Sequence, residues 1–391
     1  RQLTGMILNK SDNRRKQKPQ AFWLFFPAAS LLAAISVPLS IWAVWSGTGW
    51  PAGLLGAGHG HELIFGFALA LVAGYTLGPQ TAAVLYPLFA LWLAARLSWI
   101  FFPDTLLAQL LGPAFALLLA WHVVPRFNAA KKWRNKMVGP LILLICLLAV
   151  AFWLSTAVNL PHTHRWPGPF KLMHSAITGL LLLMTFMAGR IIAPAVAGTL
   201  EKKGVPLEAR VQPRIEGMLI VVLGCSVFLV AFPAANPITG SLLVVASGLI
   251  TLRTLRWKLW LCPERPDLLV LAAGYLWLAI GTLATGIALL RGTALAPSLH
   301  LITIGALGTL STSVMLRLAW QRSHRKAPAA GEVFSIAALV VGAATTRFMA
   351  GELPFGAPEL LWLSASFWAL AYLWVTLRLC ILAKHAKNRR K

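Results

Sequence analysis

The sequence has few charged residues, and acidic residues are the scarcer kind. Charged side chains make up 12% of the 391 residues, and Asp and Glu together number 11 against 35 Lys and Arg. Hydrophobic residues make up 58%, and the mean hydropathy is +0.73. A chain this apolar cannot bury its hydrophobic surface in the core of a soluble domain. The composition therefore excludes a soluble globular protein and predicts an integral membrane protein.

Cysteine is also scarce, and its spacing excludes two further classes of site. The four cysteines, Cys146, Cys225, Cys262 and Cys380, are far apart in the sequence, and no Cys-x-x-Cys pair occurs. Structural zinc sites and dithiol redox centres need such close spacing. Neither is expected here.

Long polar segments are missing between the apolar runs. The longest connections, around residues 125–137, 196–214 and 321–331, are short and charged, as in loops between helices. We therefore expect one transmembrane helical domain over residues 21–383, with basic cytoplasmic tails at 1–20 and 384–391. Residues 1–20 lack the apolar core of a cleaved signal, so the first apolar run is expected to direct membrane insertion.

Apolar runs long enough to span a bilayer fill the rest of the chain. A span needs roughly 20 apolar residues, and continuous rather than alternating apolar runs indicate helices. The twelve runs cover residues 22–45, 61–78, 82–102, 104–124, 138–160, 171–195, 215–233, 238–260, 268–290, 298–320, 332–350 and 358–383. The predicted fold class is all-α, a polytopic membrane protein of about twelve helices with both termini cytoplasmic. Twelve helices would permit a six-plus-six repeat, but no close repeat is visible.

The net charge of +24 follows from topology rather than from nucleic-acid binding. With a cytoplasmic N-terminus, most Lys and Arg fall in the two tails and in the connections on that side, at 126–136, 202–214, 253–265 and 322–326. This distribution is the positive-inside bias. We expect contact with the lipid bilayer, including anionic inner-leaflet lipid, and no nucleic-acid partner.

Histidines gather at the outer ends of three predicted spans. His59, His61 and Glu62 begin the second span, His174 lies about one turn into the sixth, and His300 lies in the first turn of the tenth. Ionisable groups at membrane depth are costly and usually mark a working site. Neutral imidazoles beside a carboxylate suit haem iron or copper, with the carboxylate orienting a ring. Glu62 is the candidate for this role or for handling protons.

A polar side chain among lipid headgroups is the simpler explanation for any one histidine. We favour it for His162 and His164, in the loop before the sixth span. His61 and His300 are the preferred iron or copper ligands, because each begins a run that contains helix-packing glycines. If both His59 and His61 are helical, they point roughly 160° apart. We therefore expect one of the two to lie in the glycine-flanked turn, and we rank His59 below His61 as a ligand. His174 has the same rank as His59.

Three ordered motifs resemble the NnrS family. The first is His-x-His-Glu-x-x-Phe-Gly-Phe, here His59 to Phe67, and the second is Gly-Arg-Ile-x-x-Pro, here Gly189 to Pro194. The third begins at His300 and continues through Gly305, Ala306 and Gly308 to Val314, Met315 and Arg317. The segment after the second span, Leu77 to Thr81, departs from the family pattern.

The resemblance implies a bacterial inner-membrane protein that carries haem, and less certainly copper, and takes part in the response to nitric oxide and nitrosative stress. Nitric oxide is then the expected small-molecule ligand. Arg96 and Arg347, at the outer ends of the third and eleventh spans, would pair with haem carboxylates, or would extend to outer headgroups. No second cofactor motif supplies an electron route, so the sequence favours a role other than catalysis; an enzyme here would be a haem-dependent oxidoreductase acting on nitric oxide. A proton-coupled transporter or channel that uses Glu62 and His61 is the alternative.

Overall fold

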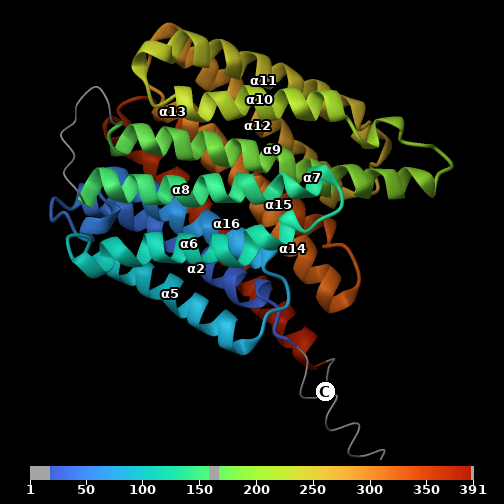
Figure 1. Cartoon of the computed structure of the whole chain (residues 1–391), viewed down its shortest axis with the longest axis horizontal. Coiled ribbons are helices and arrows are strands. Elements are labelled where there is room, and N and C mark those ends of the chain that lie inside the picture. The colour runs from blue at the N-terminus through green and yellow to red at the C-terminus, as the bar shows by residue number, and fades with distance from the viewer. Residues whose placement is uncertain (1–17, 158–166, 389–391) are drawn as a thin grey trace, which may run out of the picture.

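The fold is all-helical over the part of the chain described by the computed structural model, residues 18–157 and 167–388. The remaining parts of the predicted tails, and His162 and His164, lie outside this range. The main helices are α2 (Phe22–Trp45), α3 (Ala57–His61), α4 (Leu69–Thr76), α5 (Ala82–Phe101), α6 (Leu106–Asn128), α7 (Trp133–Lys136), α8 (Val138–Ala157), α9 (Pro169–Glu201), α10 (Pro213–Leu229), α11 (Asn236–Arg256), α12 (Pro266–Arg291), α13 (Ala296–His300), α14 (Leu307–His324), α15 (Ala330–Met349) and α16 (Pro358–Asn388). They run side by side in one bundle (Figure 1).

Eleven helices in the described residues are long and apolar enough to cross a membrane. The predicted class, a multi-pass helical membrane protein, is thereby confirmed. The predicted second span is also helical: α3, the π-helix η2 (Glu62–Ala68) and α4 follow one another without a break. It is not among the eleven because His59, His61 and Glu62 make its first turns polar. A π-helix also opens the tenth span, where η6 (Leu301–Ala306) joins α13 to α14.

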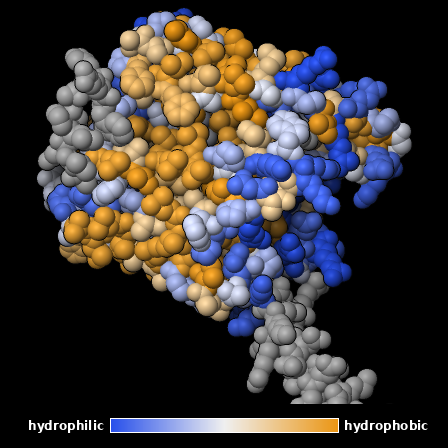
Figure 2. Space-filling model, in the orientation of Figure 1, coloured by the Kyte–Doolittle hydropathy of each residue, from blue (hydrophilic) through white to orange (hydrophobic). Residues whose placement is uncertain are grey.

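The chain's surface is apolar where a bilayer would contact it. Figure 2 shows a broad hydrophobic area over the helices and hydrophilic residues gathered toward one end of the bundle. Large exposed hydrophobic side chains include Trp121, Val221, Phe228 and Leu377. Lipid tails can cover such a surface without a desolvation cost.

The last helix closes the bundle against the first. The Trp368 indole of α16 donates a hydrogen bond to the Ala33 carbonyl of α2 at 2.9 Å, and the Ser30 hydroxyl donates to the Tyr372 carbonyl at 2.9 Å. Residues more than 330 positions apart are therefore held together by buried hydrogen bonds.

The most extensive contacts between helices recur at every fourth span. α6 packs on α8, α11 packs on α12, and α16 packs on α2. These three contacts divide the chain into three consecutive groups of four spans, at residues 22–128, 138–256 and 266–388. Of the eleven candidate spans, the most buried are α9 and the α13–α14 span, each second in its group. The four candidate histidines and Glu62 lie on the second spans of the three groups, whereas Arg96 and Arg347 lie on third spans.

Candidate functional site

A buried ion pair lies at the start of the second span. Arg96 of α5 donates a hydrogen bond from Nη1 to Glu62 Oε1 at 2.7 Å, and His61 Nδ1 is 3.0 Å from the same oxygen. Glu62 is completely buried, and Arg96 and His61 are nearly so. A single carboxylate removed from water is costly unless it is paired. Arg96 therefore balances the charge of Glu62, and Glu62 in turn fixes the His61 ring.

Aromatic side chains hold the other faces of His61. Its ring stacks on Trp99 with the centroids 3.9 Å apart, and Phe152 of α8 lies at 5.1 Å. The Trp99 indole is itself fixed by donating to the Gly53 carbonyl at 3.0 Å. His61 is thus confined to one orientation. The Trp99 and Phe152 side chains also line a cleft of about 600 Å³ that contains Lys171.

The guanidinium of Arg96 occupies the space beside Gly66. A Cβ atom on Gly66 would lie 2.8 Å from Arg96 Nη1. The Trp92 indole also donates to the Gly66 carbonyl at 2.9 Å. The first motif therefore requires a glycine at this position, because α5 approaches closely here. The sequence had indicated only that glycines in this run allow close helix packing.

His300 and His59 share the neighbourhood of Arg347. The guanidinium of Arg347 acts electrostatically on both imidazoles, and His59 acts on His300. His300 Nδ1 lies 2.6 Å from the Ala296 carbonyl of its own helix. Arg347 donates to the Gly351 carbonyl at 3.3 Å and is nearly buried. These residues come from three different spans.

Both histidines of the first motif are helical, contrary to the expectation that one lies in the turn. The turn lies three residues before His59, at Gly56, whose φ of 54° suits glycine, so α3 begins at Ala57. As helical geometry predicts, the two rings diverge: His61 contacts Glu62 and Trp99, whereas His59 faces the region of His300 and Arg347.

His174 lies near the same end of the bundle. It is half-buried on α9, and its Nδ1 atom is buried without a hydrogen-bond partner among the described residues. The preceding residue, Met173, packs against α3, because a Cβ on Gly60 would lie 3.0 Å from the Met173 sulfur. His174 thus belongs to a helix that contacts the His59 and His61 segment.

Each of these histidines has the donor chemistry of a single ligand to haem iron or copper. In residues 18–157 and 167–388, no three His, Cys, Asp or Glu side chains are close enough to form a metal site. His61 and His300, however, each have Nδ1 beside an oxygen acceptor. An acceptor at Nδ1 fixes the ring and leaves Nε2 as the ligand atom. His61 and His300 would each hold a metal as a single ligand, and no cluster of three ligands is formed among the described residues.

A shared spacing among the three histidines escaped the sequence reasoning. His61 and Gly66, His174 and Gly179, and His300 and Gly305 each show the pattern His-x-x-x-x-Gly, once in the second span of each four-span group. Two of these histidines directly precede a π-helix, η2 or η6. The spacing was readable from the sequence, and it identifies His61, His174 and His300 as equivalent positions.

A second buried ion pair was also not anticipated. Arg253 of α11 donates to Glu216 of α10 at 2.6 Å and to the Tyr275 hydroxyl at 2.9 Å. A Cβ on Gly189 would lie 2.5 Å from the Arg253 guanidinium. The glycine of the second motif thus makes room for this arginine. The cluster joins four helices and has no exposed charge, so its role is to fix their packing.

Fold and site together define a polytopic helical membrane protein with ionisable residues buried inside the bundle. The family model for NnrS protein matches residues 19–385, nearly the whole chain. The chain therefore belongs to the NnrS family. A comparison with curated proteins finds no match.

Proposed function

We propose that this chain is a haem-binding protein of the bacterial inner membrane that acts in the response to nitric oxide and nitrosative stress. Membership of the NnrS family supports the link to nitric oxide. The proposed haem ligands are His61 and His300, near the periplasmic face. The protein would bind nitric oxide, and protection from nitrosative stress would follow from that binding.

The observation that carries the proposal is the shared arrangement of His61 and His300. His61 Nδ1 lies 3.0 Å from Glu62 Oε1, and His300 Nδ1 lies 2.6 Å from the Ala296 carbonyl. In each case an oxygen acceptor fixes the orientation of the ring. Metal-bound histidines usually have such an acceptor, because it fixes the tautomer and raises the basicity of Nε2. When bound, haem would supply an iron that coordinates a diatomic gas.

Glu62 has two roles in this proposal. One oxygen orients His61 and accepts from Arg96. The other, Oε2, is buried and has no hydrogen-bond partner among the described residues. As the proton-handling group of this proposal, Glu62 would accept a transferred proton at this second oxygen, beside His61. Arg96, expected to pair with haem carboxylates, instead pairs with Glu62, and that task passes to Arg347.

His59 and His174 are the proposed copper ligands. Each has a buried Nδ1 atom with no hydrogen-bond partner among the described residues. Imidazole nitrogen is a favourable ligand for copper. A polar atom buried without a partner loses hydrogen-bond energy, and metal binding would recover that loss.

The visible spectrum of the purified protein tests the haem assignment. We expect a Soret band in the wild type, its loss or displacement in His61→Ala and His300→Ala, and a further shift when nitric oxide is added. His122→Ala, toward the C-terminal end of α6, is the matched control and should keep the wild-type spectrum. Metal analysis of the same samples tests copper, which should fall in His59→Ala and His174→Ala.

A colourless wild type, purified from haem-replete cells, would contradict the proposal. It would favour the alternative, a proton-coupled transporter, for which the buried Glu62 with its free oxygen is the supporting observation. Proton uptake coupled to transport, lost in Glu62→Gln, would then be the result to look for.

A further inference from the structure

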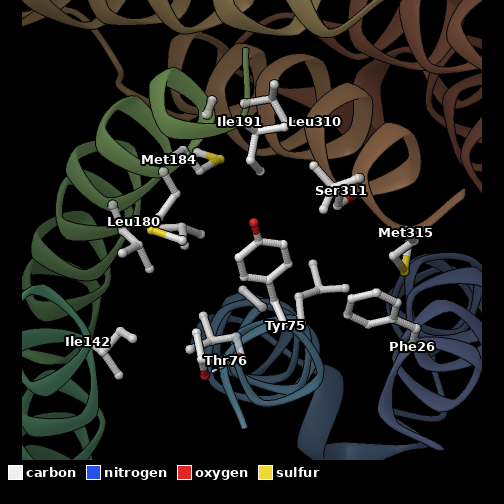
Figure 3. A pocket seen from close by; sticks show the side chains of 17 residues that line it. Phe26, Tyr75, Thr76, Ile142, Leu180, Met184, Ile191, Leu310, Ser311 and Met315 are labelled. Atoms are coloured by element: carbon white, nitrogen blue, oxygen red, sulfur yellow. Dashed lines mark hydrogen bonds between the residues drawn. The ribbon is translucent and has the colours of Figure 1, made fainter. Parts of the chain in front are cut away.

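A separate apolar cavity lies between α2, α4, α8, α9 and α14. It has a volume of about 120 Å³ and is bounded mainly by the second spans of the three groups, which contribute Tyr75, Met184, Ala188, Ser311 and Met315 (Figure 3). No histidine lines it. The cavity is therefore distinct from the site of His61 and His300.

Its size and lining suit a single six-membered ring. A dry, apolar cavity of about 150 Å³ is known to bind benzene, and this cavity is of similar volume. Met184, Met187 and Met315 supply three thioether sulfurs to the lining. Thioethers pack favourably against the edges of aromatic and quinoid rings. The walls thus favour a flat ring over a linear chain of the same volume.

One hydroxyl is available to a ligand in the cavity. Figure 3 shows the Tyr75 ring standing in the open space with its hydroxyl group directed toward Ile191 and Leu310. Within the described residues this hydroxyl makes no hydrogen bond, whereas the Ser311 hydroxyl is bound to Tyr372 at 2.7 Å. The Tyr75 hydroxyl can therefore donate a hydrogen bond to a ligand oxygen, such as a ring carbonyl.

The rim of the cavity is apolar and accessible. Tyr75 is 39% exposed, so the cavity is open beside it. Leu71, Val72, Ile191 and Val314 are half-buried along the same lining. A hydrocarbon substituent on a bound ring could therefore extend out of the cavity across an apolar rim, without exposing a polar backbone group.

We propose that this cavity binds the ring of a lipid-soluble benzoquinone, or of its quinol, with the Tyr75 hydroxyl donating a hydrogen bond to one ring oxygen. The proposal does not depend on haem. It adds a ligand class that neither the family nor the histidine site assigns. Such a site would place a membrane electron carrier inside the bundle.

Equilibrium binding of a tritiated decyl-substituted benzoquinone to the full chain in phosphatidylcholine nanodiscs tests this proposal. We expect saturable binding to the wild type. Tyr75→Phe keeps the ring but removes the donor, and it should weaken binding about tenfold. Ala188→Phe fills the cavity and should abolish binding.

The chain offers a matched control for each substitution. Tyr86 and Ala90 are exposed on α5, away from the cavity, so Tyr86→Phe and Ala90→Phe should bind as the wild type does. If Ala188→Phe is not monodisperse on size exclusion, Tyr75→Phe alone decides the outcome.

Two results would overturn the proposal. One is the absence of saturable binding to the wild type. The other is equal competition by decylbenzene together with unchanged affinity in Tyr75→Phe, which would show that the cavity accepts any hydrocarbon. Because the radioactive label alone reports binding, the test also works for a protein without a Soret band. Its outcome is therefore independent of the haem proposal.

Discussion

At the scale of the residue, the absence of a side chain at Gly66 determines how Arg96 reaches Glu62. A Cβ at this position would lie 2.8 Å from Arg96 Nη1 and 2.9 Å from its Cδ. Gly66→Ala should therefore displace the guanidinium and lower the free energy of unfolding by about 1–3 kcal/mol, as other overpacked cores do. The thermal unfolding of the purified protein measures this effect.

Gly224 of α10 provides the control for that substitution. No atom lies within 4 Å of a Cβ built there. Gly224→Ala should keep or raise the stability, because alanine favours a helix by about 1 kcal/mol over glycine. Equal destabilisation of both variants would show that Arg96 does not depend on the space at Gly66.

At this scale the sequence singled out the histidines and Glu62, the acceptor beside His61, but not the contacts that their arginine and aromatic neighbours make. His59, His61, His174 and His300 stand out because imidazoles are rare among apolar residues. Arg96 was expected to face a haem carboxylate, since its depth is readable from the span. The direction of its side chain is not readable, because it depends on how α5 lies against the second span. Trp99 and Phe152 were missed for the same reason.

At the scale of the element, two π-helices are placed directly after the proposed haem ligands. η2 follows His61, and η6 follows His300. A π-helical turn carries an extra residue relative to an α-helix and is common at functional sites. Deletion of Leu63 in η2 should restore α-helical spacing and turn His61 by roughly 100° relative to the rest of the span.

The expected result of the Leu63 deletion is loss of the stacking of His61 on Trp99 and, with it, loss of any Soret band. Deletion of Asp104, in the exposed connection between α5 and α6, is the matched control and should preserve the spectrum. A spectrum that the Leu63 deletion leaves intact would show that the π-helix does not position the ligand.

The elements themselves were largely predictable from apolar runs, but their local geometry was not. Observed helices lie at all twelve predicted runs, and α14 and α16 extend several residues past the predicted ends. The π-helices change only the hydrogen-bond register, which composition does not reveal. The partners of two hydroxyls in the tenth span are likewise visible only in the structure: Thr303 bonds back to the Leu299 carbonyl, and Ser311 bonds to Tyr372.

At the scale of the whole molecule, the direction of the bundle in the membrane follows from its charges. The end that carries His300 is separated from the end of α16 by three spans, so the histidines and Asn388 lie at opposite ends. Lys131, Lys203 and Lys326 lie in connections at the Asn388 end. Figure 2 shows hydrophilic residues gathered toward the end of the bundle at which α16 ends in Figure 1. The positive-inside rule assigns this end to the cytoplasm.

Reporter fusions measure that orientation directly. Green fluorescent protein fused after Lys391 should fluoresce, because it folds in the cytoplasm. Alkaline phosphatase inserted after Thr293, in the connection between α12 and α13, should be active, because that connection would face the periplasm. Exchanging the two reporters should silence both. The reverse pattern would move the histidines to the cytoplasmic side and would require nitric oxide and copper to reach them from the cytoplasm. The proposed periplasmic site therefore depends on a property of the whole chain that no single site residue determines.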